Sequence, residues 1–283
     1  NSNSSDKSIP YTLIGQQAVP IGTSHHDVLN GGFGADLLYG RGGNDTLNGG
    51  FGNDILNGGT GKDVMSGGFG NDTYYVDNKG DSVKETFSFL FDKDTVYSTV
   101  SYALPANVEN LTLAYEGSGS ILGRGNQLSN TLIGQSALSG GTEILRGGAG
   151  NDILISKPGD YKQAYLYGEA DNDRLIGNGH LIGGTGKDTY ELKGLSNTVQ
   201  IARGDSTPTH FDVIKGFSLA QTPANANRLD LNSTHIAQDV ATVNGKDAGT
   251  IHSHHISNGL ISFDDLNTYT NPLAITADKI ADA

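Results

Sequence analysis

The sequence predicts an all-β fold, a parallel β-roll (right-handed β-solenoid) of short stacked strands, and three observations carry this prediction. A nine-residue unit repeats five times over residues 31–75, as GGFGADLLY, GRGGNDTLN, GGFGNDILN, GGTGKDVMS and GGFGNDTYY. Weaker copies flank it at 22–30 (GTSHHDVLN) and 76–84 (VDNKGDSVK). All seven copies keep an aspartate in the sixth place and an apolar or aromatic residue in the eighth. A short fixed period is the signature of a solenoid.

The residue types within each unit indicate how it folds. Glycines at places one, two and four permit positive φ, so the first six residues are expected to form a tight turn that ends in the aspartate. The last three residues are just long enough for a very short strand whose middle residue points inward. The expected inward residues are Leu29, Leu38, Leu47, Leu56, Met65, Tyr74 and Val83.

Stacking the turns would place the sixth-place carboxylates in columns of like charge. One buried leucine contributes about 1.5–3 kcal/mol, whereas ordering nine backbones costs roughly 9–18 kcal/mol, so the thin core needs help. A cation between the carboxylates would supply it, and oxygen ligands in a flexible cage suit calcium better than magnesium. The candidate ligands are Asp27, Asp36, Asp45, Asp54, Asp63, Asp72 and Asp81.

The pattern GGxGxDxUx resembles the RTX (hemolysin-type) calcium-binding nonapeptide of bacterial proteins exported by type I systems, which folds as a parallel β-roll. The chain resembles the RTX regions of S-layer and adhesin proteins and the carboxy-terminal domain of serralysins. The resemblance implies two repeats per coil turn, with calcium between loops on the same edge. One edge would carry Asp27, Asp45, Asp63 and Asp81, and the other Asp36, Asp54 and Asp72.

The resemblance also implies backbone ligands in the glycine loops. Departures from the pattern at Arg41, at 23–25 and at 76–81 are expected to weaken the end sites most. The implied backbone ligands are Gly31, Gly32, Phe33, Gly34, Gly40, Gly42, Gly43, Gly49, Gly50, Phe51, Gly52, Gly58, Gly59, Thr60, Gly61, Gly67, Gly68, Phe69 and Gly70, and later in the chain Gly147, Gly148, Gly150, Gly183, Gly184 and Gly186.

The composition shifts along the chain predict five regions. These are a lead-in with the first strands (1–21), the first roll (22–84), a β spacer or cap (85–124), a second, degenerate roll (125–191), and a carboxy-terminal cap next to an export signal (192–283). In the spacer, apolar residues at even positions from Val96 to Leu104 predict one strand with a buried face, with Val100 and Tyr102 on that face. Residues 110–113 predict a second strand.

The second roll keeps the repeat in damaged form. Asp152, Asp173 and Asp188 hold the sixth place, and Asn130 and Glu143 stand there in two further turns. Counting alternate turns puts Asn130 and the three aspartates on one edge. The opposite edge has Glu143, an oversized loop at 156–164 and a shortened turn at 177–180. We therefore expect about two calcium sites here and five in the first roll, about seven in all.

Composition and motifs limit the function classes. The net charge is −13, from 18 Lys plus Arg against 31 Asp plus Glu, which disfavours nucleic acid as a partner. Cysteine is absent, so disulfides contribute nothing, and no apolar run reaches the ~20 residues of a membrane span. HExxH and GxSxG motifs are missing, and the chain begins at Asn1 without a signal peptide, as a fragment or processed form would.

One cluster stands apart from the repeats. His252, His254 and His255 could bind a transition metal, although a solvated loop or strand explains them as well. No catalytic residue is predicted in this chain.

Two function classes follow. In the first, the chain is a calcium-binding structural module of a secreted bacterial cell-surface protein, S-layer or adhesin-like, that folds on calcium outside the cell. Its partners would be calcium, the type I secretion apparatus, and cell-surface polysaccharide or further copies in a surface layer. In the second, it is the export-and-folding region of a secreted protease, lipase or polysaccharide-modifying enzyme whose catalytic domain lies elsewhere.

Overall fold

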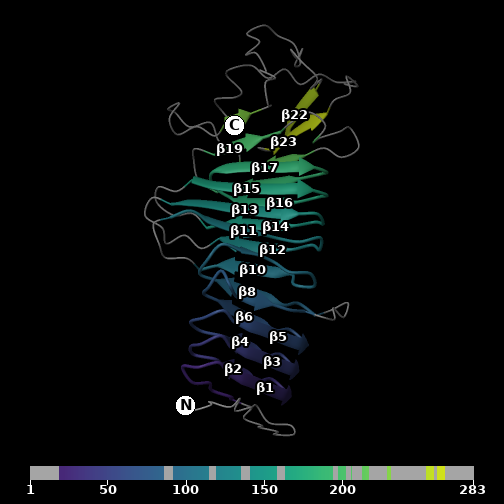
Figure 1. The fold of residues 1–283 in the computed structure, drawn as a ribbon. Coiled ribbons are helices and arrows are strands. Elements are labelled where there is room, and N and C mark those ends of the chain that lie inside the picture. Colours follow the sequence, from purple (N-terminus) through teal and green to yellow (C-terminus); the bar gives the residue numbers. More distant parts are fainter. Residues whose placement is uncertain are drawn as a thin grey trace, which may run out of the picture. The chain divides into compact units, whose positions relative to one another are not determined.

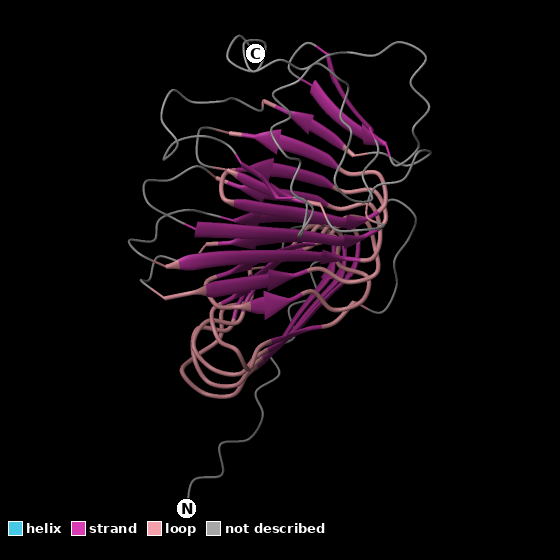
Figure 2. Ribbon diagram, turned by 90° about the horizontal axis from the view of Figure 1, so that it is seen from above, coloured by secondary structure: helices cyan, strands magenta, loops and turns pink. Residues whose placement is uncertain are grey.

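A computed structural model describes residues 19–85, 92–114, 119–134, 141–157, 163–193, 197–201, 205, 212–216 and 228–230, and the backbone of 253–257 and 260–264. Every regular element among them is a β-strand (Figure 2), and none of them forms a helix able to cross a membrane. The chain divides into two compact units, one of residues 1–116 with 121–135 and one of residues 117–120 with 136–283.

The first unit is a stack of parallel strands in which the chain alternates between two sheets (Figure 1). Partners in each sheet within the repeats are 18 residues apart, as in Thr46↔Val64, so one coil turn uses two repeats. One sheet contains β1 (Val28–Phe33), β3 (Thr46–Phe51), β5 (Val64–Phe69) and β7 (Ser82–Val83). The other contains β2 (Leu37–Tyr39), β4 (Ile55–Asn57), β6 (Thr73–Val76), β8 (Thr95–Ser98), β10 (Asn110–Leu113) and β12 (Thr131–Gly134).

The core of this stack is one inward side chain per strand. The inward positions expected from the repeat are confirmed, because six of the seven are fully buried and Val83 is nearly so. Their chain neighbours are partly exposed, which is the alternation a half-buried strand requires. The fully buried residues are Leu29, Leu38, Leu47, Leu56, Met65 and Tyr74.

The expected strand length was wrong for one of the two sheets. Strands β2 and β4 have three residues, as expected, but β1, β3 and β5 have six and continue through the third place of the next repeat. That third place is a phenylalanine, and Phe33, Phe51 and Phe69 stack at centroid distances of 5.0 and 4.7 Å. Cross-strand stacking of identical rings extends the pairing into the loop.

The spacer also differs from expectation. The single strand expected over residues 96–104 is two, β8 and β9 (Tyr102–Ala103), separated by a bend. The Ser98 hydroxyl causes the break, because it donates to Val100 O and accepts from Val100 N. The strand expected at 110–113 is confirmed as β10. Strand β8 pairs with both β6 and β10, so the stack continues past the last repeat, while β9 pairs with β11 (Ile121–Arg124).

The second unit repeats this architecture with parallel strands in two sheets. Its buried core includes Leu145, Leu154, Leu166, Leu175 and Tyr190. One sheet contains β13 (Thr142–Gly148), β15 (Gln163–Ala170), β17 (His180–Thr185), β19 (Thr198–Gln200) and β21 (Arg228–Asp230). The other contains β14 (Ile153–Ser156), β16 (Arg174–Gly177), β18 (Thr189–Leu192) and β20 (Val213–Lys215), followed by the antiparallel β23 (Leu260–Asp264) and β22 (Ser253–Ser257).

Several expectations fall on residues outside the described part. Most of the lead-in does, although Ile21 pairs with Tyr39 as an isolated bridge. His252 is outside it as well. His254 and His255 fall on β22, of which only the backbone is described.

Candidate metal centre

The repeat aspartates of the first unit form two hydrogen-bonded ladders. In each, the backbone N–H of one aspartate donates to Oδ1 of the aspartate one turn further on, at 2.7–3.1 Å. The first ladder is Asp27, Asp45, Asp63 and Asp81, and the second ladder is Asp36, Asp54, Asp72 and Asp94. The two edges predicted from the repeat are therefore confirmed, and the second gains one member.

The other carboxylate oxygen distinguishes these aspartates from ordinary buried ones. Oδ2 of Asp45, Asp54, Asp63 and Asp72 is buried and makes no hydrogen bond. A buried carboxylate oxygen without a donor is strongly unfavourable unless a cation compensates it. The ladders thus contain rows of oxygens that a hard cation would satisfy.

The glycine in the first place of each repeat makes room for those oxygens. A Cβ on Gly49 would collide with Asp54 Oδ2 and would lie 2.7 Å from the carbonyl oxygen of Gly67 on the next turn. Carboxylate and carbonyl oxygens therefore converge beside this glycine. Of the three glycine places that permit positive φ, places two and four adopt it, for example at Gly50 and Gly52, whereas the first-place Gly49 does not. The first place needs glycine for space, because the oxygens occupy the volume of a side chain.

Burial changes the protonation of the ladders. Burial, with smaller contributions from neighbouring carboxylates, raises the pKa of Asp54 and of Asp63 to about 6 and that of Asp72 to about 7. A carboxylate in this setting favours either a proton or a bound cation. The arrangement, an acidic and oxygen-rich row without lysine or arginine partners on its free oxygens, fits calcium.

The terminal aspartates of the first ladder differ from the interior ones, because protein donors bond their Oδ2 atoms. Asp27 Oδ2 accepts from the backbone N–H of Thr23 at 2.6 Å and from its hydroxyl at 2.8 Å. Asp81 Oδ2 accepts from the backbone N–H groups of Asp77 and Asn78. Protein donors thus satisfy the terminal carboxylates. That gives a physical basis for the weak end sites, which remain a prediction.

A third ladder runs through the second unit. Backbone N–H groups of Asp152, Asp173 and Asp188 donate to Oδ1 of the next aspartate at 2.8, 2.8 and 2.9 Å, and the last acceptor is Asp212. The phasing of Asp152, Asp173 and Asp188 on one edge is confirmed by the pairs Ile153↔Arg174 and Arg174↔Thr189. Burial raises the pKa of Asp173 and Asp212 to about 8 and that of Asp188 to about 7.

Sequence reasoning missed four buried or half-buried acids at these edges: Glu85, Asp94, Glu109 and Asp212. Asp94 and Asp212 continue the ladders after 22 and 24 residues, so a search at a period of 18 passes over them. The Asp-x-apolar triplets 94–96 and 212–214 were the available signal. Glu109 accepts from Asp94 N at 2.8 Å. Asn130 has a structural role, accepting from Asn126 N and donating to Val108 O.

Comparison with protein families agrees with this geometry. The model of the RTX calcium-binding nonapeptide repeat matches four times, over residues 21–56, 39–74, 139–160 and 165–179. No curated protein matches the chain. The chain therefore carries RTX repeats, and calcium is the ion that such repeats bind. The matched segments contain most of the three ladders but not Asp81, Asp94, Asp188 or Asp212, and they do not contain Glu85.

Proposed function

We propose that this chain, which carries RTX calcium-binding repeats, is a calcium-folded structural module of a bacterial cell-surface protein exported by a type I system. The observation that carries the proposal is the set of buried ladder oxygens that lack any protein donor, such as Oδ2 of Asp54 and Asp63. In calcium-poor cytosol the chain would stay unfolded and fit a narrow export channel. Outside the cell, calcium would drive its folding.

The energetic argument is that metal binding energy here is folding energy. The ladders form only when the turns stack, and stacking brings like charges together, as between Asp54 and Asp36. Because no such site exists in the unfolded chain, the free energy of calcium binding adds to the stability of the fold. We propose about seven ions, with dissociation constants in the extracellular range of roughly 10⁻⁴–10⁻³ M.

The surface of the first unit favours a cell-surface role over an export tail. Phe33 and Phe51 are 60% and 48% exposed and stack with Phe69 in a row across three strands. An exposed apolar row supports an interaction surface, for cell-surface polysaccharide or for further copies of the chain. The alternative is the folding region of a secreted protease, lipase or polysaccharide-modifying enzyme. The parent gene separates the two, since a hydrolase motif upstream would support the alternative.

Circular dichroism of the whole chain tests the calcium requirement. We expect the β signal to be lost in chelator and to return cooperatively between about 0.1 and 10 mM calcium. Magnesium at the same concentrations is the control and should restore much less signal, because it demands a smaller octahedral cage. An identical β spectrum in chelator and in millimolar calcium would refute the proposal.

A further inference from the structure

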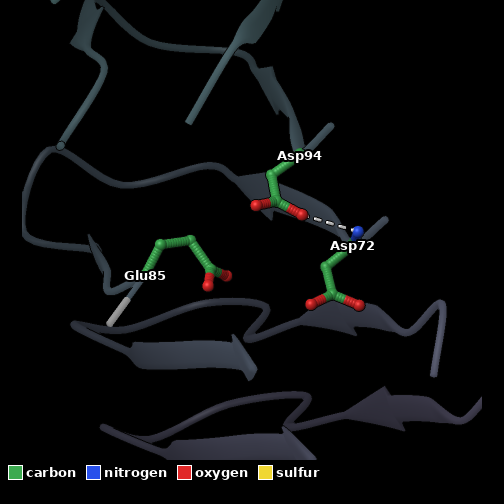
Figure 3. Close-up of side chains that lie close together, drawn as sticks. All are labelled: Asp72, Glu85 and Asp94. Carbon is green, nitrogen blue, oxygen red and sulfur yellow. Dashed lines mark hydrogen bonds between the residues drawn. The ribbon is translucent and has the colours of Figure 1, made fainter. Parts of the chain in front are cut away.

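Three acids from separate segments meet where the first repeat block ends. Asp72 precedes β6, Asp94 precedes β8, and Glu85 follows β7. One carboxylate oxygen from each lies within 4.8 Å of the other two. Figure 3 shows the three carboxyl groups facing a common space. The side chains are only 1%, 8% and 3% exposed for Asp72, Glu85 and Asp94, so water does not solvate this charge.

Two of these oxygens are buried and lack a hydrogen bond. Asp94 Oδ1 accepts from Asp72 N at 2.8 Å. The Tyr74 hydroxyl donates to Glu85 Oε1 and accepts from Gly67 N. These bonds leave Asp72 Oδ2 and Glu85 Oε2 without a donor. The cluster is held in place by its own hydrogen bonds, and its unpartnered oxygens face inward. A cation can compensate these buried carboxylates, whereas a neutral ligand cannot.

The sequence position of Glu85 explains how it comes to this place. The first-place glycines Gly31, Gly49 and Gly67 are spaced by 18 residues, and the next position in that series is Glu85. The register Met65↔Val83 and the bond from Lys84 N to Met65 O carry the stack to this point. A glutamate therefore stands where the next first-place glycine of this series would be.

The atoms around Gly67 differ from those around the equivalent glycine one turn earlier. A Cβ on Gly49 would meet the carbonyl oxygen of Gly67, but a Cβ on Gly67 would meet the Tyr74 hydroxyl instead. In the regular turns the next glycine loop supplies the oxygen. Here the tyrosine hydroxyl lies beside the glycine and donates to the Glu85 carboxylate, so a side-chain oxygen lies where the regular turn places a backbone carbonyl oxygen.

We propose that Asp72, Glu85 and Asp94 bind a calcium ion outside the nonapeptide pattern, which closes the first repeat block onto the strands that follow it. Oxygens on opposite sides of a calcium ion are about 4.6–5.2 Å apart, whereas magnesium requires about 4.0–4.2 Å. The oxygens of this cluster all lie within 4.8 Å of one another, which is close enough for them to contact one ion. A cage of carboxylate oxygens without a strict octahedral geometry suits calcium better than magnesium. Three carboxylates, against two between neighbouring repeat aspartates, favour the highest affinity in the unit and a preference for trivalent lanthanides.

Terbium binding to the whole chain tests the site. Terbium added below stoichiometry should fill the three-carboxylate site first, and Tyr74 beside it should sensitise its emission. The nearly isosteric Glu85→Gln should lower affinity there by roughly tenfold or more and remove one ion from the total measured by equilibrium dialysis. Asp92→Asn is the matched control, because Asp92 is close enough to act on Asp72 electrostatically but is outside the cluster. It should keep both readouts.

The three-carboxylate site does not depend on the proposed function, and different results of these experiments would overturn each of them. A Glu85→Gln chain that folds in calcium and binds as many ions as the parent, with unchanged terbium emission, would overturn the site and leave the proposed function intact. If Glu85→Gln does not fold, Glu85→Asp keeps the charge but shortens the reach, and unchanged emission in that variant would overturn the site equally. A chain that ignores calcium altogether would instead refute the proposed function.

Discussion

The two units keep the same aspartate ladder on very different sequence spacings. In the repeats of the first unit, ladder neighbours are always 18 residues apart. In the third ladder the spacings are 21, 15 and 24 residues, yet the N–H to Oδ1 distances remain 2.8–2.9 Å. The bond between aspartates therefore sets the register of each turn. The number of residues between successive ladder aspartates can vary while this bond is kept.

For the spacings of 21 and 15 residues, the difference from 18 lies on the opposite edge of the second unit. For the spacing of 24 residues it lies in residues 201–212, on the ladder edge before Asp212. On the opposite edge the equivalent register positions in successive turns are Glu143, Ala164, Gly179 and Asn197, none of them aspartate. Asn197 Oδ1 accepts from Gly179 N at 2.9 Å, the same bond that ladder aspartates make. An amide thus keeps the hydrogen bond without the charge. Strand register and metal binding can therefore be separated. An edge that maintains the register without binding metal tolerates loops of different length.

The largest expected effect comes from disturbing loop length on the two kinds of edge. A Gly-Ser-Gly insertion between Thr60 and Gly61 displaces the loop before Asp63 and removes about two sites. At ten- to hundredfold calcium over Kd each site contributes about 1.4–2.7 kcal/mol, so the first unit should lose roughly 3–5 kcal/mol. The same insertion between Gly177 and Asn178 should cost under about 1 kcal/mol, as loop lengthening does. Thermal unfolding in saturating calcium measures both, and equal losses would contradict the distinction between edges.

Alanine substitutions within the ladders should have the next largest effect. Asp54 lies between Asp36 and Asp72, and Asp173 between Asp152 and Asp188, so each is shared by two gaps. Asp54→Ala and Asp173→Ala should each cost about two sites, roughly 3–5 kcal/mol in excess calcium. Asp81→Ala should cost about half as much, because Asp81 ends its ladder and protein N–H groups already hold its second oxygen.

The calcium midpoint of the β signal compares these three variants. Equal midpoints for Asp54→Ala and Asp81→Ala would show that interior and terminal aspartates are equivalent. A much smaller shift for Asp173→Ala than for Asp54→Ala would show that the third ladder does not share its ions.

The sequence was sufficient to predict the ladders wherever the period held. Two columns in phase over seven copies placed every inward residue of the first repeat block, because stacking converts a fixed period directly into a position in space. The resemblance to RTX repeats, with two repeats per coil turn, placed the aspartates on two edges. The same count by alternate turns phased Asp152, Asp173 and Asp188 correctly despite their uneven spacing. Here the regularity lies in the order of turns and not in their lengths.

The features that the sequence did not predict depend on contacts between residues outside the nine-residue period. Asp94 and Asp212 follow lengthened connections, so only the folded chain brings them onto the ladders. The break between β8 and β9 arises from one serine hydroxyl that turns the backbone at Val100, which alternation of apolar residues does not reveal. The role of Glu85 depends on the Tyr74 hydroxyl, a contact across 11 residues.

The smallest expected effect is that of pH on the calcium midpoints of the two units. The pKa of Asp173 is about 8 and that of Asp188 about 7, whereas the pKa values of Asp54 and Asp63 are about 6. All lie above the ordinary value of 3.8, so protonation stabilises the calcium-free fold at low pH, and this stabilisation is lost as pH rises through the folded pKa. Calcium binding requires the deprotonated form and therefore competes with the proton.

Lowering the pH from 8.5 to 6.5 should thus protonate most of the third ladder, and Asp72 in the first unit, while leaving Asp54 and Asp63 largely ionised. The calcium midpoint of the second unit should rise several-fold, and that of residues 46–57 by less than about twofold. Hydrogen exchange with mass spectrometry, followed in calcium titrations at both pH values, reports each unit separately through peptides from 46–57 and 174–192. Equal shifts in both peptides, or a larger shift in the first, would mean that the higher pKa values of the third ladder do not control its calcium affinity.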